Sequence, residues 1–439
     1  MTLTSSSPDH VTPYDRFAWS DTQVEQWLAS GERRRELMAY FGAAEYRALA
    51  ALARRAQRLR PGAAARVLVV PGIMGSQLGL QRPPPLPHDI VWIDPIDIHL
   101  GRLAWLRLPP AAPIVPLGVV LFSYLRLKLY LRARGFAAEF HDYDWRLPVA
   151  ESGRALAARI KALRGARLAI VAHSMGGLVT RAALALPDTG HIERVVLLGT
   201  PNDGSFAAVQ ALRGVYAVVR KVARLEAASA ETLAAQVFNT FPSLYDLLPH
   251  GACAGTFDLF DARQWPADGP RPLAALLQAA RAAQARLAPA DERFAVIAGV
   301  GAETVTALGR RRGDFVYTLT RHGDGTVPVA SAELAGAPAA YARVAHSELT
   351  RDPEVAAAVV DLLERGASQR LPRRWLGASR AQARVSDAQL RRSHTDKVDW
   401  GALTPEERRL FLENLNEPPR FTLRVPASTH RVPRGSRRR

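Results

Sequence analysis

The sequence predicts an α/β fold in which helices cover both faces of a mostly parallel sheet and a helical insertion forms a cap. Three observations support this fold class. Short apolar runs typical of buried strands alternate with helical patterns from residue 67 to residue 200. Glycine-containing turns follow several of these runs. The alternation then stops for a mostly helical stretch, residues 206–289, and a strand pattern resumes at Phe294.

The composition is that of a folded globular protein. Hydrophobic residues make up 48% of the 439 residues and charged residues 23%, so the chain can bury one large core or two ordinary ones. We expect three regions: a helical extension at residues 1–60, an α/β domain at 61–375 that contains the insertion, and a basic tail at 376–439.

The net charge of +17 comes mainly from arginine, because the only lysines are Lys128, Lys161, Lys221 and Lys397. Codon usage in a GC-rich genome is the simplest explanation of this composition. Attraction to an anionic membrane surface is a second explanation, and nucleic-acid binding is a third. No zinc-finger, RRM-like or helix-turn-helix pattern supports the third, so a nucleic-acid partner is not expected. The sequence leaves the oligomeric state open.

Cys253 is the only cysteine, so no internal disulfide and no cysteine metal cluster can form. No metal and no other cofactor is expected. Residues 1–11 lack the basic and apolar segments of a secretory signal. The longest apolar stretch, residues 112–125, is interrupted by Pro113 and Pro116. We therefore expect a cytoplasmic protein without a transmembrane helix, and peripheral membrane association stays open.

The first sixty residues are predicted to be helical, with Ser20 near a helix start and an interruption near Gly42. A buried strand follows at Val67–Val70 and ends in the loop Pro71–Ser76. A glycine directly after a buried strand allows a tight turn whose N–H groups face the carboxyl end of the sheet. This loop could supply half of an oxyanion hole, or it could be an ordinary turn.

The next elements repeat the alternation of helix and strand. A helix is predicted at residues 123–134 with Gly135 after its end, then a strand at 137–141 and a helix at 152–163. The stretch Asp142–Arg146 could be the rim of a site or a structural aspartate–arginine pair. We favour the structural pair.

Ser174 lies between a predicted strand, Arg167–Val171, and a predicted helix. A strand that turns sharply into a helix forces the turn residue into a strained backbone, which requires small residues two positions to either side. Ala172 and Gly176 meet that requirement. The turn would lift Ser174 Oγ above the sheet and direct the Met175 N–H toward the same space.

The insertion at 206–289 follows the predicted strand Arg194–Leu198, at the carboxyl end of the sheet, where a cap over a site would lie. Its apolar residues exceed what one helix face can bury, so we expect a lipid-facing surface. These residues are Phe238, Phe241, Leu244, Tyr245, Leu247 and Leu248. A plain helical bundle at the edge of the sheet is the alternative.

The elements predicted after the insertion are the strands Phe294–Ala298, Phe315–Thr320 and Ala342–Ala345, the loop Arg321–Pro328 and the helix Pro353–Arg365. An activated serine needs a base within hydrogen-bond reach and an acid that holds the tautomer of that base. Ser174, Asp324 and His346 occur in the chain order Ser, Asp, His that such a fold requires. Asp203 is a rival acid, and His322 is a rival base.

Five motifs together resemble the lecithin:cholesterol acyltransferase family over residues 67–363: Pro71–Ser76, Tyr143–Arg146, Ala172–Gly177, Gly323–Pro328 and His346–Leu349. The resemblance implies an α/β-hydrolase fold with Ser174 as nucleophile, His346 as base and Asp324 as orienting acid. It also implies an oxyanion hole made by the N–H groups of Ile73 and Met175.

The activity that the resemblance implies is cleavage of fatty-acyl esters of lipids, phospholipids or acylglycerols, through an acyl-enzyme. Transfer of the acyl group to an alcohol is a variant of the same chemistry. The alternative is a non-catalytic protein that uses a hydrolase scaffold to bind a membrane or a nucleic acid.

Overall fold

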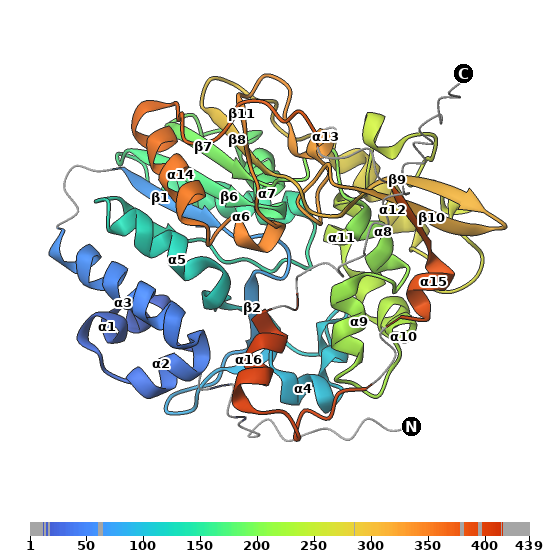
Figure 1. The fold of residues 1–439 in the computed structure, drawn as a ribbon, viewed down its shortest axis with the longest axis horizontal. Coiled ribbons are helices and arrows are strands. Elements are labelled where there is room, and N and C mark those ends of the chain that lie inside the picture. The colour runs from blue at the N-terminus through green and yellow to red at the C-terminus, as the bar shows by residue number, and fades with distance from the viewer. Residues whose placement is uncertain are drawn as a thin grey trace, which may run out of the picture.

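Figure 1 shows the computed structural model, which describes residues 12, 15, 18–59, 65–284, 286–377, 382–393, 397–413 and 415. A six-stranded sheet forms its centre, in the order β11-β8-β7-β6-β1-β5, and every pairing in it is parallel. The strands are β1 (Arg66–Val70), β5 (Ala137–Phe140), β6 (Leu168–His173), β7 (Ile192–Leu198), β8 (Phe294–Gly299) and β11 (Ala339–Ala342).

Helices cover both faces of this sheet. Successive side chains of a strand point to opposite faces, and the strands carry apolar side chains on both, so each face needs a covering layer. In β1, Leu68 and Val70 pack with α6, α7 and the insertion, whereas Val67 and Val69 pack with α5 and α14. These helices are α5 (Leu121–Arg132), α6 (Val149–Ala162), α7 (Met175–Leu184) and α14 (Pro353–Arg365). The predicted fold class is confirmed.

Three helices of the N-terminal segment lie beside α5 (Figure 1). They are α1 (Asp21–Ser30), α2 (Arg34–Phe41) and α3 (Ala43–Arg58). Lys128 of α5 makes ion pairs with Asp21 and Glu25 of α1, and Arg126 donates a 2.9 Å hydrogen bond to Glu45 of α3. Apolar side chains of these helices join the core on the α5 face of the sheet, so the segment is part of the folded body.

A small antiparallel sheet, in the order β3-β2-β4, lies between β1 and α5 in the chain. Its strands are β2 (Ser76–Leu80), β3 (Asp89–Trp92) and β4 (Val115–Val119). A Cβ atom on Gly79 would lie 1.8 Å from the carbonyl oxygen of Asp89, so the close approach of β2 and β3 requires glycine there. Helix α4 (Pro95–His99) follows β3, and the Asp94 side chain caps it.

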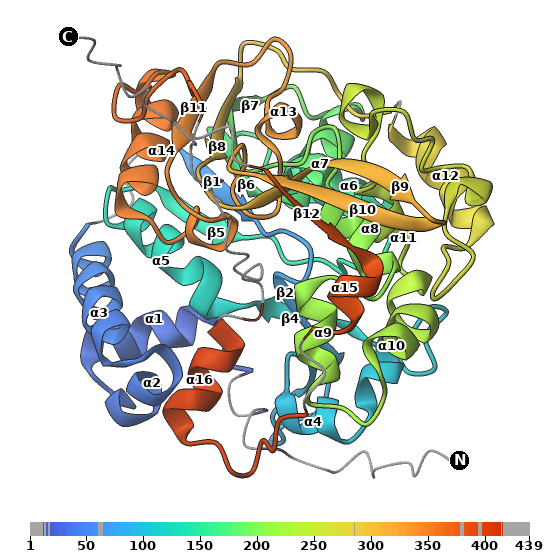
Figure 2. The ribbon, with the colours of Figure 1, turned by 45° about the vertical axis from the view of Figure 1, so that its right-hand side comes forward.

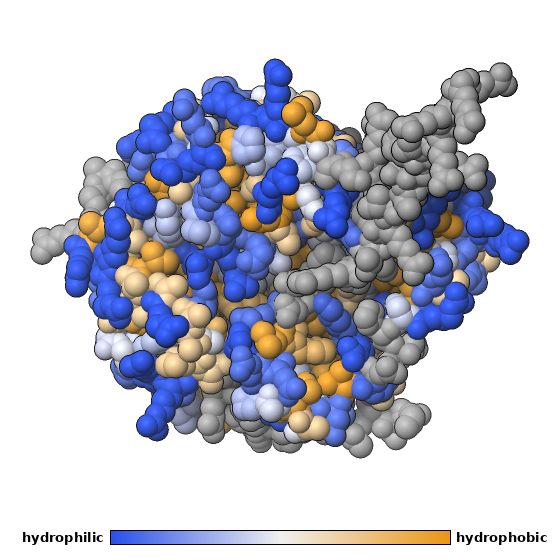
Figure 3. Space-filling model, in the orientation of Figure 1, coloured by the Kyte–Doolittle hydropathy of each residue, from blue (hydrophilic) through white to orange (hydrophobic). Residues whose placement is uncertain are grey.

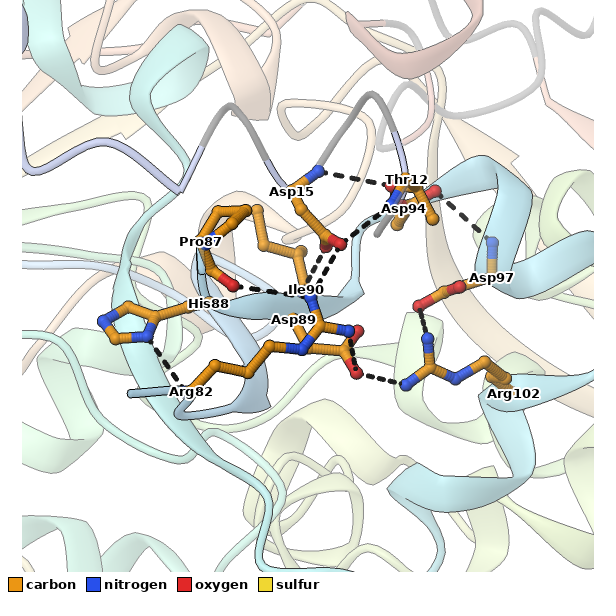
Figure 4. Close-up of polar contacts among 10 residues, drawn as sticks. All are labelled: Thr12, Asp15, Arg82, Pro87, His88, Asp89, Ile90, Asp94, Asp97 and Arg102. Carbon is orange, nitrogen blue, oxygen red and sulfur yellow. Dashed lines mark hydrogen bonds and ion pairs between the residues drawn. The ribbon is translucent and has the colours of Figure 1, made fainter. Parts of the chain in front are cut away.

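A buried cluster of charged and polar side chains ties the small sheet to the N-terminal segment (Figure 4). Its members are Thr12, Asp15, Arg82, Asp89, Asp94, Asp97 and Arg102. Asp89 receives both guanidinium groups, at 2.9 Å from Arg82 and 2.5 Å from Arg102. Arg82 also pairs with Asp15 at 3.0 Å, and this pair connects the segment after β2 to the N-terminal part of the chain.

The cluster holds four carboxyl groups and two guanidinium groups, and burial raises the pKa of two of the carboxyl groups. Burial raises the pKa of Asp94 to about 6. Burial and the neighbouring Asp94 carboxylate together raise the pKa of Asp97 to about 7, although Arg102 lies 2.5 Å from Asp97. Both carboxyl groups therefore titrate near neutral pH.

The insertion is mostly helical, as predicted, but the expected lipid-facing surface is wrong. Its helices are α8 (Phe206–Leu212), α9 (Ala217–Ala223), α10 (Ala230–Gln236), α11 (Pro242–Asp246) and α12 (Ala274–Gln284). The six apolar residues that were assigned to that surface are all buried in the main core. The Phe241 ring, for example, packs edge-on against Trp145 at 5.6 Å. On the face shown in Figure 3, hydrophobic residues form separate small patches among hydrophilic ones.

A second antiparallel sheet, in the order β12-β10-β9, lies beside the insertion, and α15 lies next to its strand β12 (Figure 2). Its strands are β9 (Thr304–Arg311), β10 (Asp314–Thr320) and β12 (Ala383–Ser386), and helix α15 (Asp387–Arg391) follows β12. Helix α13 (Val329–Ala332) packs on β8, and α16 (Pro405–Glu413) packs on α2. Asp387 accepts hydrogen bonds from Arg213 at 2.7 Å and Tyr317 at 2.6 Å. Residues 383–413, which the sequence assigned to a tail, thus include elements packed on the body. The arginine-rich stretch 420–439 lies outside the described residues.

In the part of the chain that the structure describes, no helix has both the length and the apolar character that a bilayer crossing requires.

Candidate active site

Ser174 occupies the turn between β6 and α7, with φ 54° and ψ −130°. Residues other than glycine rarely adopt a positive φ, so the turn is strained and depends on tight packing around it. A Cβ atom on Gly176 would lie 2.5 Å from the carbonyl oxygens of Val70 and Pro71. Ala172 is completely buried, so its single methyl group is accommodated two residues before the serine. The sharp turn predicted from the motif is present.

Three side chains from distant parts of the chain meet at this turn. His346 Nε2 lies 2.9 Å from Ser174 Oγ, and His346 Nδ1 lies 2.8 Å from Asp324 Oδ2. The other carboxylate oxygen of Asp324 accepts hydrogen bonds from the N–H groups of Thr326 and Val327. The carboxylate is thus held in one orientation, with a single oxygen directed at the histidine.

The rival residues lie elsewhere. Asp203 has a half-exposed side chain 3.8 Å from His250 Nε2. His322 is exposed, and its ring lies against Gly377. The structure therefore brings together Ser174, Asp324 and His346, and it keeps both rivals out of that group.

The loop after β1 lies directly against Ser174. A Cβ atom on Gly72 would lie 2.7 Å from Ser174 Cβ, so only glycine allows this approach. The Tyr143 hydroxyl donates a 2.8 Å hydrogen bond to the Pro71 carbonyl and fixes the start of the loop. Ile73 follows Gly72 in the loop, and Met175 is the first residue of α7, whose leading N–H groups have no partner within the helix.

The stretch Asp142–Arg146, which could have been a site rim, has a structural role. Arg146 is almost completely buried and pairs with Asp144 at 2.6 Å. Its guanidinium also donates a hydrogen bond to the Leu106 carbonyl at 2.9 Å. The Trp145 indole donates to the Ser76 carbonyl at 3.0 Å, so this stretch fastens β5 to the small antiparallel sheet.

A narrow pocket of about 90 Å³ opens above Ser174. Apolar side chains of the loop after β1, the insertion and the Asp324 loop form most of its wall, namely Ile73, Met74, Ala207, Ala208, Ala211, Val218, Leu244, Leu247 and Val327. Two of the six apolar residues once assigned to a lipid-facing surface, Leu244 and Leu247, thus face the site from inside the protein. Its apolar walls suit an apolar group better than a charged one.

Two residues next to the serine, Tyr124 and His173, were not predicted from the sequence to belong to the site. Both are buried and line the pocket. The position of His173 directly before the serine was a visible signal, whereas nothing in the sequence near Tyr124 indicated that α5 reaches the site. Among the described residues, no group of three His, Cys, Asp or Glu side chains is arranged to hold a metal ion.

The central sheet, the strained serine turn and the cap above the carboxyl ends of the strands define an α/β-hydrolase fold. Residues 160–242, which include the serine turn, match the family described as PGAP1-like alpha/beta domain. That match covers a minor part of the chain, and the narrower resemblance to the lecithin:cholesterol acyltransferase family stays a prediction. A search of curated proteins finds no match.

Two solved structures are similar in part. The mature form of the Bacillus licheniformis lipase BlEst2 has 16% sequence identity, with 69% of this chain and 94% of that chain covered and a TM-score of 0.36. A chain of the Tle4–Tli4 complex has 13% identity, with coverage of 69% and 98% and a TM-score of 0.45. These scores are low, so the assignment of the fold rests on the sheet and the serine turn.

Proposed function

We propose that the protein is a serine hydrolase that cleaves carboxylic esters with apolar acyl groups through an acyl-enzyme. One observation carries the proposal: Ser174, His346 and Asp324 form a continuous hydrogen-bonded chain, with distances of 2.9 and 2.8 Å, at the mouth of an apolar pocket. The strained turn at Ser174 adds support, because residues with a strained backbone cluster at active sites.

The first half of the reaction forms the acyl-enzyme. His346 Nε2 takes the proton of Ser174 Oγ, which attacks the ester carbonyl carbon. The N–H groups of Ile73 and Met175 stabilise the oxyanion, and removing one such donor in known hydrolases costs about 3 to 4 kcal/mol. The tetrahedral intermediate then expels the alcohol, which leaves with the proton from His346. Asp324 accepts the hydrogen bond from Nδ1–H throughout and keeps Nε2 available as the base.

The second half releases the acyl group. A water molecule gives its proton to His346 and attacks the acyl carbonyl, and Ser174 leaves with that proton. An alcohol in place of water would yield a new ester, which is the acyltransferase variant of the reaction.

The substrate class follows from the pocket and the charge of the chain. Apolar walls favour the acyl chain of a lipid ester, such as a phospholipid or an acylglycerol. The net charge of +17 favours peripheral contact with an anionic membrane surface at a cytoplasmic site of action. A nucleic-acid partner has no comparable support.

Hydrolysis of nitrophenyl esters of increasing chain length tests this function. We expect turnover by the wild-type protein and a loss of about 10³-fold or more in Ser174→Ala. Ser152→Ala, in helix α6, is the control and should keep wild-type rates. Added alcohol shows from the product whether transfer competes with hydrolysis. If Ser174→Ala turned the ester over as fast as the wild-type protein, the proposal would be refuted. A folded but inactive wild-type protein would favour the non-catalytic alternative.

A further inference from the structure

Two buried side chains that the proposed reaction does not use connect the loop beside Ser174 with the backbone of His346. Tyr124 projects from α5, and His173 is the last residue of β6. Tyr124 Oη lies 2.9 Å from the Gly72 nitrogen and 3.0 Å from His173 Nδ1. His173 Nε2 lies 3.0 Å from the carbonyl oxygen of His346.

The chemistry of these atoms fixes the direction of each hydrogen bond. A carbonyl oxygen can only accept, so His173 Nε2 carries a proton and donates it to His346 O. In a neutral imidazole, Nδ1 then accepts, so the Tyr124 hydroxyl donates to it. The hydroxyl oxygen in turn accepts from the Gly72 N–H.

The surroundings keep both groups neutral, as this order requires. Burial and the neighbouring His346 hold the pKa of His173 well below its ordinary value. Burial raises the pKa of Tyr124, so its hydroxyl keeps the proton. Both shifts thus favour the neutral forms that this order of donors and acceptors requires.

We propose that Tyr124 and His173 form a positioning relay, which holds the loop after β1 (Pro71–Ser76) and the His346 backbone in one fixed arrangement around Ser174. The relay rests on the proposed function, because its purpose is to align the groups of that reaction. Neither residue touches the reacting atoms through these bonds. Each acts on a neighbour: Gly72 precedes Ile73, and the His346 carbonyl belongs to the residue whose ring meets Ser174.

Packing around the relay supports this role. The rings of His173 and His346 lie 4.7 Å apart, so the backbone bond and the ring contact both restrain the base. The N–H of His346 is held as well, by the Asp324 carbonyl at 2.9 Å. A Cβ atom on Gly75 would lie 2.8 Å from Tyr124 Oη, which shows that the far end of the loop also closes on the tyrosine.

Tyr124→Phe tests the relay, because it removes one oxygen atom and keeps the ring. Tyr245→Phe is a matched control: Tyr245 is equally buried, accepts from the Leu273 N–H at 2.9 Å and donates to the Asn239 carbonyl at 2.7 Å. Both variants lose a buried tyrosine hydroxyl with one backbone donor, so their melting temperatures should fall together.

The kinetic result separates positioning from general stability. We expect kcat of Tyr124→Phe to fall about 10- to 100-fold at an unchanged KM, since misplaced groups weaken binding of the transition state and not of the ester. Tyr245→Phe should keep the wild-type kcat. Equal kcat values for the two variants, in an active wild-type background, would overturn the relay and leave the proposed function intact. A wild-type protein that cleaves no ester would overturn the proposed function, and the relay with it.

A spectroscopic measurement judges the relay without turnover. In protein with 15N-labelled histidine, the His173 signal is assigned by its absence in His173→Gln. We expect its shifts to report a neutral ring protonated on Nε2 at pH 6, below the ordinary histidine pKa of about 6.5. A proton on Nδ1, or a doubly protonated ring at pH 6, would contradict the order of bonds from which the relay is inferred.

Discussion

At the scale of single residues, the hydrogen bonds of Asp324 explain why asparagine could not replace it. One carboxylate oxygen accepts from the Thr326 and Val327 N–H groups, and the other accepts from His346. An asparagine at this position would keep its oxygen on the two N–H groups and turn its NH₂ toward His346 Nδ1. The histidine would then carry its proton on Nε2 and could not accept one from Ser174.

We therefore expect Asp324→Asn to lower kcat by about 10⁴-fold, as the wrong tautomer does in other triads. Asp203→Asn is the matched control, because Asp203 is half exposed and pairs with His250. Steady-state kinetics on a soluble ester make the comparison. A greater loss in Asp203→Asn than in Asp324→Asn would reassign the acid.

The residues of the candidate site could be named from the sequence because each belongs to a local pattern. The small residues around Ser174, the glycines around Asp324 and the chain order of the three side chains are all visible in the printed letters. The contacts of Tyr124 are different, because its partner His173 is 49 residues away and the pairing depends on how α5 packs. No periodicity or turn signal encodes that distance.

At the scale of elements, the serine turn depends on the close packing of Gly176 against β1 and the loop that follows it. A Cβ atom on Gly176 would overlap two backbone oxygens of the neighbouring β1 loop, whereas one on Gly190 would meet nothing within 4 Å. We expect Gly176→Ala to destabilise the protein by about 1–3 kcal/mol, through overpacking that displaces the loop beside Ser174.

Gly190→Ala should be neutral, or stabilising by less than about 1 kcal/mol. Urea unfolding measures both free energies of unfolding. Equal stability of the two alanine variants would show that the contacts of Gly176 do not exclude a side chain at this position.

The buried charge cluster gives the small antiparallel sheet a pH dependence of known sign. The pKa of Asp97 is raised from its ordinary value of 3.8 to about 7 in the folded protein, so the folded state binds the proton at a higher pH than the unfolded state does. The contribution of this group to stability is therefore present below about pH 4 and is lost as the pH rises to about 7.

We expect the wild-type protein to gain on the order of 1 to 3 kcal/mol from this group between pH 8 and pH 5, and Asp97→Asn to lack that gain. Asp291→Asn is the control, because hydrogen bonds from Arg293 lower the pKa of Asp291. Asp291 therefore stays ionised between pH 8 and pH 5, and this variant should keep the wild-type gain. The measurement is the free energy of unfolding against pH. Parallel curves for wild type and Asp97→Asn would show that Asp97 does not titrate in this range.

Five strands of the central sheet were predictable, because parallel strands buried on both faces read as continuous apolar runs. The sixth, β11, was predicted at Ala342–Ala345 but lies at Ala339–Ala342, because this short alanine-rich strand at the edge of the sheet has no distinct apolar pattern. β2, β3 and β4 were not predictable, since they are short and contain or adjoin glycine and proline, as in Ser76–Leu80 and Val115–Val119. The burial of Phe238 and Phe241 was also misjudged. The insertion packs against Trp145 and the small sheet, and these surfaces were unknown without the tertiary structure.

At the scale of the whole molecule, the surplus of arginine predicts attraction to anionic lipid. We expect the protein to bind vesicles that contain an anionic phospholipid and to be released as salt is raised from about 0.05 to 0.5 M, because screening weakens such contacts. Neutral vesicles are the control. A chain that ends at Pro419 tests how much the arginine-rich stretch contributes to vesicle binding. Sedimentation with the vesicles measures binding. Salt-independent binding to both vesicle types would mean that the charge is only a feature of composition.

The central claim is that Ser174, activated by His346 and Asp324, is the nucleophile of a hydrolase. The most direct test is incubation with a fluorophosphonate probe, followed by mass-spectrometric mapping of the adduct, because the probe reacts with an activated serine and not with an ordinary one. We predict a single adduct on Ser174, lost in Ser174→Ala and retained in Ser152→Ala. A folded wild-type protein that forms no adduct, or one that carries it on another serine, would contradict the claim.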